Sequence, residues 1–81
     1  MHIQFYGGLA DRLGRSINLD LPEAIRTVAD LRQLLGEAYP DSAGEITSGA
    51  LKACIGDEIV GDAHDLHRTD MVEFFPPLSG G

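Results

Sequence analysis

The sequence predicts an α+β fold in which one main helix lies across one face of a mixed sheet of about five strands. Five short segments carry apolar residues in the pattern of half-buried strands, and one longer segment, residues 28–38, carries them at helical spacing. With 81 residues, the chain forms a single small domain that buries only about 60% of its unfolded surface. The core must therefore come from these few elements.

Two strands are expected in the amino-terminal part. The first, residues 2–6, alternates so that Ile3 and Phe5 face the core. A pair of glycines breaks it, and a turn or a helical turn over residues 9–14 leads to a second strand, residues 16–21. Because the connection is short, the two strands are predicted to pair antiparallel.

The main helix has a predicted beginning and end. Thr27 is the expected N-cap, with Asp30 at the third helical position in a near capping box. Apolar residues at helical spacing continue to Ala38, and a Tyr-Pro pair ends the helix. The polar residues, Arg32 among them, are expected mostly on the opposite face.

The second half of the chain is predicted to contain three further strands, residues 51–55, 59–60 and 71–75. The polar connection before them has room for one helical turn around Ile46, and Leu66 holds the loop before the last strand. In that strand, Val72 and Phe74 face the core and Phe75 faces outward.

This order of elements resembles the β-grasp, or ubiquitin-like, arrangement, expected here over residues 1–76. In the topology of that family the first and last strands are central, parallel neighbours, so the resemblance implies the same placement here. A single main helix can cover only one face of the sheet. Alternation therefore puts Tyr6 and Phe75 on the open face, where Ile59 joins them. Such an exposed cluster predicts a docking patch, although loops could instead cover some of these residues.

The sequence ends in Pro76-Pro77-Leu78-Ser79-Gly80-Gly81. Proline has no N–H to donate to a sheet, so strand pairing should stop at Pro76. Residues 77–81 are predicted to be a flexible, extended tail. Its two glycines lack a Cβ and can enter a channel too narrow for other residues. The hypothesis is a terminal carboxylate delivered into another protein's active site; the alternative is an ordinary frayed terminus.

Charge and composition narrow the function classes. Thirteen acids against six bases give a net charge of −7, which argues against nucleic acid and favours a partner with a basic face. No stretch approaches the roughly 20 apolar residues of a membrane span, and the start lacks the pattern of a signal peptide. The single cysteine, Cys54, fits a reducing compartment. We expect a cytoplasmic protein.

No catalytic constellation is predicted in the body of the domain. His64 and His67 have the chemistry of metal ligands but share one polar loop, whereas zinc needs three or four rigid ligands, so no metal site is predicted. Cys54 is out of phase with the buried residues of its strand and has no base adjacent in sequence, which predicts an unreactive thiol on the open face. The carboxyl terminus therefore remains the candidate reactive group, because ATP can convert a carboxylate into a reactive acyl-adenylate.

Three stretches carry a family resemblance: Phe5-Tyr6 with Leu9, Thr27-Val28 with Leu31-Arg32, and above all Glu73-Phe74-Phe75-Pro76-Pro77-Leu78-Ser79-Gly80-Gly81. On these residues, and over its whole length, the chain resembles the small subunit of molybdopterin synthase, the MoaD family of ubiquitin-like sulfur carriers. The related thiamine sulfur carrier also ends in Gly-Gly but usually lacks the double proline.

The resemblance implies that a ubiquitin-activating-type adenylyltransferase and sulfurylase uses ATP to adenylate Gly81. A persulfide-derived sulfur would then make a thiocarboxylate. Bound to the large catalytic subunit in a heterotetramer, the tail would donate this sulfur to cyclic pyranopterin monophosphate during molybdenum cofactor biosynthesis. The small subunit would have no activity alone and no permanently bound cofactor. Gly80 would accompany Gly81, and the implied partner-binding residues are Tyr6, Ile59, Phe75, Pro76, Pro77, Leu78 and Ser79.

Two other functions remain open on the sequence. The first is a sulfur carrier of another pathway, such as thiamine or cysteine synthesis. The second is a ubiquitin-like modifier whose tail is conjugated to lysines.

Overall fold

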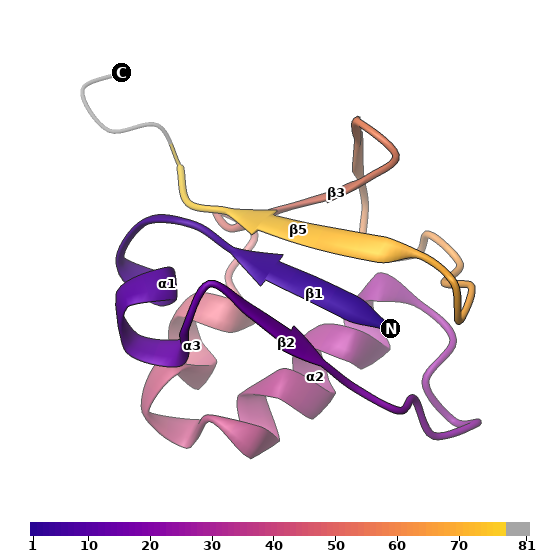
Figure 1. The fold of residues 1–81 in the computed structure, drawn as a ribbon, viewed down its shortest axis with the longest axis horizontal. Coiled ribbons are helices and arrows are strands. Elements are labelled where there is room, and N and C mark those ends of the chain that lie inside the picture. Colours follow the sequence, from indigo (N-terminus) through magenta and orange to yellow (C-terminus); the bar gives the residue numbers. More distant parts are fainter. Residues whose placement is uncertain (78–81) are drawn as a thin grey trace.

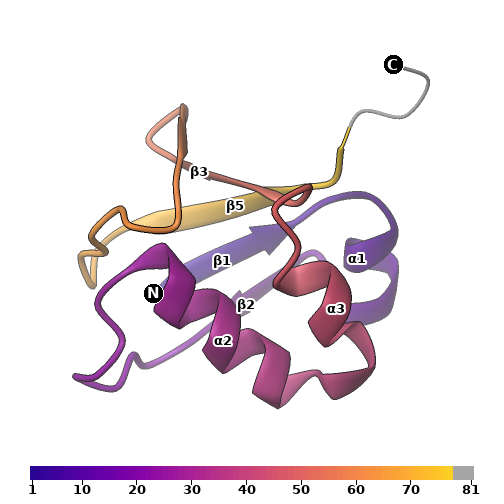
Figure 2. The ribbon, with the colours of Figure 1, turned by 180° about the vertical axis from the view of Figure 1, so that it is seen from behind.

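Five strands form one mixed sheet in the order β2-β1-β5-β3-β4 in the computed structural model, which describes residues 1–77 (Figure 1). The strands are β1 (His2–Phe5), β2 (Ser16–Asn18), β3 (Lys52–Ile55), β4 (Glu58–Val60) and β5 (Met71–Phe75). The helices are α1 (Gly7–Leu13), α2 (Val28–Ala38), the 3₁₀ helix η1 (Pro40–Ser42) and α3 (Ala43–Ile46). All of them lie on one side of the sheet, which leaves the other face open (Figure 2). The predicted β-grasp fold is confirmed.

The centre of the sheet is the predicted parallel pair. β1 and β5 run side by side with Ile3 opposite Val72 and Phe5 opposite Phe74. All four of these side chains are buried, as the alternation requires, and they face the helices. β5 ends at Phe75, so pairing stops before the prolines, as predicted.

Two elements near the amino end differ from the prediction. β2 ends at Asn18 and not at residue 21. One more pair of hydrogen bonds joins Leu19 to Met1: the Leu19 N–H donates to the Met1 carbonyl at 2.8 Å, and the Met1 amino group donates to the Leu19 carbonyl at 2.6 Å. The two glycines after β1 do not form a simple break; they begin the seven-residue helix α1. Leu9, which is fully buried, explains this, because one helical turn brings its side chain into the core.

The main helix begins and ends as predicted, with a complete capping box. Thr27 Oγ1 accepts a hydrogen bond from the Asp30 backbone N–H at 3.2 Å, and Asp30 Oδ2 accepts one from the Thr27 N–H at 3.1 Å. A further bond comes from the Arg26 N–H at 3.0 Å. These two backbone donors, Arg26 first, lower the pKa of Asp30 because they stabilise its charged form. The predicted helical turn around Ile46 is α3, and Ile46 is fully buried.

The loop that precedes β5 is tied to the start of α2. The Val28 and Ala29 N–H groups donate to the carbonyls of His64 and Asp62 at 3.0 and 2.9 Å, and the Leu66 N–H donates to Arg26 at 2.8 Å. The first N–H groups of a helix have no partner within it, so the loop satisfies them. Leu66 packs against the core, which confirms its predicted role.

The expectation for Arg32 is wrong, because its side chain lies under the sheet with only 6% of its surface exposed. Its guanidinium carbon is 5.4 Å from the centre of the Phe74 ring, and Nε donates to Asp62 at 2.9 Å. Its terminal nitrogens also donate to three carbonyls between α3 and β3, those of Ile46, Ser48 and Leu51 at 2.9, 3.1 and 2.6 Å. Arg32 thus donates to all three carbonyls, and the Ser48 carbonyl also accepts from the Leu51 N–H at 3.2 Å.

Candidate functional site

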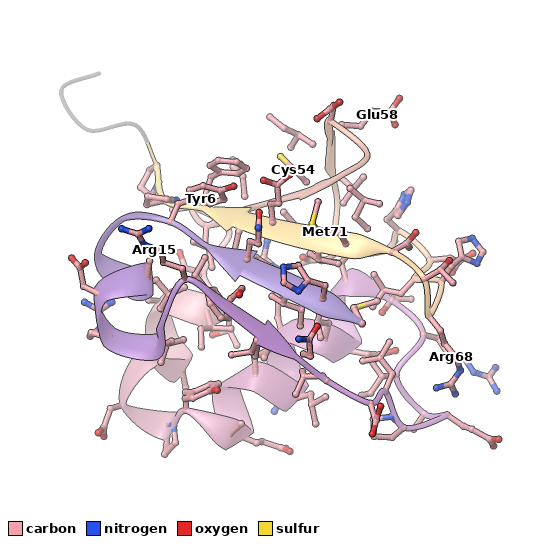
Figure 3. The ribbon with its side chains drawn as sticks, viewed as in Figure 1. Tyr6, Arg15, Cys54, Glu58, Arg68 and Met71 are labelled. Atoms are coloured by element: carbon pink, nitrogen blue, oxygen red, sulfur yellow. The ribbon has the colours of Figure 1, made fainter. Side chains whose placement is uncertain are left out.

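The open face of the sheet carries the predicted cluster. Figure 3 shows Tyr6, Cys54 and Met71 on the side of the sheet away from the helices. Alternation in β5 adds Glu73 and Phe75 to the same face. Leu78, Ser79, Gly80 and Gly81, the other residues predicted to act, lie outside the described residues.

Tyr6 and Phe75 form a stacked aromatic pair at the end of the central strands. Their ring centroids are 4.3 Å apart and their planes differ by 7°. Tyr6 follows β1 by one residue and caps α1 with an extended backbone, at φ −133° and ψ 161°. It therefore continues the alternation of β1, and its ring comes to lie beside β5. The pair combines a large apolar contact with 36% exposure of Tyr6, which is suitable for binding another protein.

The hydroxyl of Tyr6 is hydrogen-bonded to side chains of the two central strands. Its hydroxyl donates to Glu73 Oε2 at 2.5 Å and lies 3.1 Å from Gln4 Oε1. The hydrogen bond to Glu73 is the main cause of the raised pKa of Tyr6, because a phenolate could not donate to the carboxylate. The phenol is therefore protonated at neutral pH.

An apolar groove of about 790 Å³ runs beside this aromatic pair toward the edge strand β4. Its far end is Ile59, which is 70% exposed and lies opposite Cys54 in the antiparallel pairing of β3 and β4. The groove is lined by Tyr6, Ala50, Lys52, Cys54, Ile59, Phe75, Pro76 and Pro77. Five of the predicted partner-binding residues are thus brought together, and their role in binding stays a prediction.

The point where the chain leaves the sheet is defined by a contact that sequence reasoning missed. Gly7 has a φ of 67°, and a Cβ on it would lie 2.8 Å from Pro76 Cγ. Only glycine both adopts this conformation readily and leaves room for the proline ring. Lys52 and Ala50 were also missed; Lys52 lies opposite Phe75 in the β3–β5 pairing. The pair of glycines after β1 was the available signal for Gly7.

Cys54 lies in the groove without the surroundings of a nucleophile. Burial is the first cause that raises the pKa of its thiol, and the charges of Glu73 and Asp57 raise it further. All three disfavour the thiolate, which is the reactive form. Within residues 1–77, no group of three or more His, Cys, Asp or Glu could hold a metal ion, and no helix is long and apolar enough to cross a membrane.

The five-stranded mixed sheet in the order β2-β1-β5-β3-β4, with its helices on one side, defines a ubiquitin-like β-grasp fold. The ThiS family profile matches residues 3–81, so the chain belongs to the ThiS family, the ThiS/MoaD-type ubiquitin-like sulfur carriers. No curated protein sequence matches the chain significantly.

Solved structures show the same fold at low sequence identity. The crystal structure of SAMP1 from Haloferax volcanii is 24% identical with a TM-score of 0.76, and the match covers 99% of this chain and 97% of that one. The solution structure of the HVO 2177 protein from the same organism is also 24% identical, with a TM-score of 0.81 over 99% and 84% of the two chains.

A third similar structure is the protein–protein complex of subunits 1 and 2 of molybdopterin-converting factor from Helicobacter pylori 26695. One of its chains is 17% identical with a TM-score of 0.65, and the match covers 99% of this chain and 96% of that one.

Proposed function

We propose that this protein is the sulfur-donating small subunit of molybdopterin synthase. The observation that carries the proposal is the apolar groove beside Tyr6 and Phe75, which lies where the chain turns into the Pro-Pro-Leu-Ser-Gly-Gly ending. The ThiS family membership supports a sulfur carrier, and the double proline favours the molybdopterin pathway among the carriers. The protein has no catalysis of its own in this proposal.

The chemistry is carried by Gly81. Its carboxylate attacks the α-phosphate of ATP on an activating enzyme, and pyrophosphate leaves. The resulting acyl-adenylate is a mixed anhydride, so a sulfur nucleophile can attack its carbonyl carbon and expel AMP. The sulfur of the thiocarboxylate then forms a bond to cyclic pyranopterin monophosphate on the large subunit, and water cleaves the acyl–sulfur bond, which returns Gly81 to its carboxylate. Gly80 and Gly81 suit this chemistry because a chain without Cβ atoms can enter a narrow channel.

The body of the domain supplies the docking. In this proposal the large subunit binds the domain formed by residues 1–76, and the tail, residues 77–81, enters the active site of the large subunit. Tyr6, Ile59 and Phe75 offer apolar surface, and the net charge of −7 attracts a basic partner face. The Helicobacter pylori complex, in which a chain of this fold is bound in molybdopterin-converting factor, supports this arrangement. Two transfers per product imply a heterotetramer, and a reduced Cys54 implies the cytoplasm.

The first test follows the mass of the intact protein. After incubation with the activating enzyme, ATP and a sulfur source, the proposal expects a gain equal to the replacement of one oxygen by sulfur. Deletion of Gly81 should abolish that gain while the urea unfolding curve stays unchanged, because β5, the last strand, ends six residues earlier at Phe75. A full mass gain without Gly81 would refute the proposed chemistry.

The second test measures binding to the large subunit. Phe75→Ala removes one ring of the aromatic pair and should weaken binding by about 10-fold or more, as expected for an aromatic anchor at the centre of an interface. Met71→Ala is the matched control, since Met71 is also apolar and 46% exposed on the same face of β5 but lies outside the groove. Equal effects of the two substitutions would mean that the groove is not the docking site.

The products distinguish the alternatives. A thiocarboxylate that supports thiamine or cysteine synthesis, and not molybdopterin synthesis, would assign the protein to another sulfur pathway. Stable isopeptide adducts on lysines of other proteins would instead indicate a modifier. The ThiS family match favours sulfur transfer over conjugation.

A further inference from the structure

The Tyr6 ring forms a wall of the groove, yet only part of it is packed. Within residues 1–77 its one aromatic contact is the stack on Phe75, with centroids 4.3 Å apart and planes 7° from parallel, and 36% of the residue is exposed. A tyrosine at a surface can rotate about its first side-chain torsion into other staggered positions. Rotation away from Phe75 would uncover that ring and remove one side of the groove.

Glu73 accepts a hydrogen bond from the Tyr6 hydroxyl, and this bond would have to break before the ring could rotate away. Glu73 lies in the central strand β5, directly opposite Gln4 on one side and Cys54 on the other. Glu73 and Phe75 are two residues apart and lie on the same face of β5. If the Tyr6 ring is to cover Phe75 while its hydroxyl reaches the Glu73 carboxylate, the ring must lie along β5. The hydroxyl and the carboxylate are 2.5 Å apart, which is the length of a strong, charge-assisted hydrogen bond.

The carboxylate has no competing cation in the described part of the chain. The ion pairs within residues 1–77 join Arg12 to Glu45 and Arg32 to Asp62, and neither involves Glu73. Gln4, the nearest polar side chain across the β1–β5 pairing, is itself 3.1 Å from the same hydroxyl. The hydrogen-bond partners of the Tyr6 hydroxyl, Glu73 and Gln4, therefore favour a single orientation of the ring, the one stacked on Phe75.

We propose that Glu73 is a positioning residue of the docking surface, which holds the Tyr6 ring flat on Phe75 before the partner arrives. This inference rests on the proposed function, whose partner is the large subunit. Immobilising a free side chain at an interface opposes binding, and a ring that is already held avoids that cost. Glu73 thus acts on affinity through Tyr6 without being an apolar contact itself.

Binding of the large subunit to single and double variants tests the coupling. Tyr6→Phe keeps the ring and removes its hydroxyl, and Glu73→Ala removes the acceptor; each should weaken binding by about 3- to 10-fold. The double variant should be no weaker than either single one, because both remove the same hydrogen bond. Effects that multiply in the double variant would overturn the proposal.

The conservative variant separates the hydrogen bond from charge. Glu73→Gln keeps an acceptor oxygen without the charge and should recover part of the affinity that Glu73→Ala loses. Glu37→Gln is the matched control, because it removes one negative charge from an exposed position on α2, on the other side of the sheet. If Glu73→Gln binds as weakly as Glu73→Ala, the effect comes from charge and the proposal fails.

Titration of Tyr6 tests its interaction with Glu73, through both the hydrogen bond and the charge, without any partner. The chain has two tyrosines, so in a Tyr39→Phe background the ultraviolet absorbance change at alkaline pH reports Tyr6 only. Its pKa should lie above the ordinary value for tyrosine and fall toward that value in Glu73→Ala. An unchanged titration would overturn the positioning role. Failure of the unsubstituted protein to bind the large subunit would instead refute the proposed function, and the docking role of Glu73 with it.

Discussion

Arg32 provides the sharpest test of what holds this fold together. Arg32→Met keeps an unbranched chain of similar length but removes every donor, so the carbonyls of Ile46 and Leu51 lose their bond from the guanidinium. The Ser48 carbonyl loses one of two bonds, because the Leu51 N–H also donates to it at 3.2 Å. A buried polar group without a partner costs about 1–3 kcal/mol. Because Ser48 is only half-buried, water can reach part of the site, and we expect a total loss of about 3–5 kcal/mol.

That loss is large for a domain of this size. At about 0.05–0.15 kcal/mol per residue, 81 residues correspond to a free energy of unfolding of roughly 4–12 kcal/mol. Each kcal/mol shifts the midpoint of thermal unfolding by about 4–8 °C in a domain of 60–100 residues. The melting temperature should therefore fall by more than about 10 °C.

Urea unfolding followed by far-ultraviolet circular dichroism measures the change, since the chain has no tryptophan. Gln33→Met is the control for the substitution itself, because Gln33 is the exposed neighbour on α2, and its effect should stay within about 0.5 kcal/mol. Asp62→Asn should cost no more than about 1 kcal/mol, because the side chain of Asp62 is 60% exposed. A cost below about 1 kcal/mol for Arg32→Met would refute the role assigned to its hydrogen bonds.

Two further predictions concern the exit of the chain and the cap of α2. Gly7→Ala should displace Pro76 and reduce sulfur transfer. Gly14→Ala is the control: Gly14 has a φ of 96° and no atom near its Cβ position, so this substitution introduces the backbone strain without the collision. Equal transfer by the two variants, at equal stability in urea, would contradict the prediction. Asp30→Ala should destabilise the protein above pH 3.8, the ordinary pKa of the side chain. The folded pKa is lowered, so this stabilising contribution is lost as pH falls through the folded value. The difference between the urea midpoints of Asp30→Ala and the unsubstituted protein should shrink in acid; a constant difference would count against the capping role.

Local patterns determined much of this protein. The bounds of α2 follow from residues three and four apart, and its cap from Thr27 and Asp30, which interact within one turn. The alternation of β1 and β5 determined which aromatic residues face the core and which face outward. With one main helix to cover the sheet, that alternation was enough to predict the open-face cluster of Tyr6, Ile59 and Phe75.

Only the tertiary structure decided the rest, because those features depend on residues far apart in sequence. Arg32 lies one helical turn after Val28, on the buried side of α2, although its charge predicted a solvent-facing side chain. Carbonyls 14 to 19 residues away accept hydrogen bonds from its guanidinium and make that burial possible. The opening of α1 depends on space in the core for Leu9, and the exit of the chain depends on Pro76 meeting Gly7. The bond between Tyr6 and Glu73 spans 67 positions. Periodicity predicts which face of a helix or strand a side chain occupies. The residues that the side chain contacts on that face depend on which strands and helices the fold brings together.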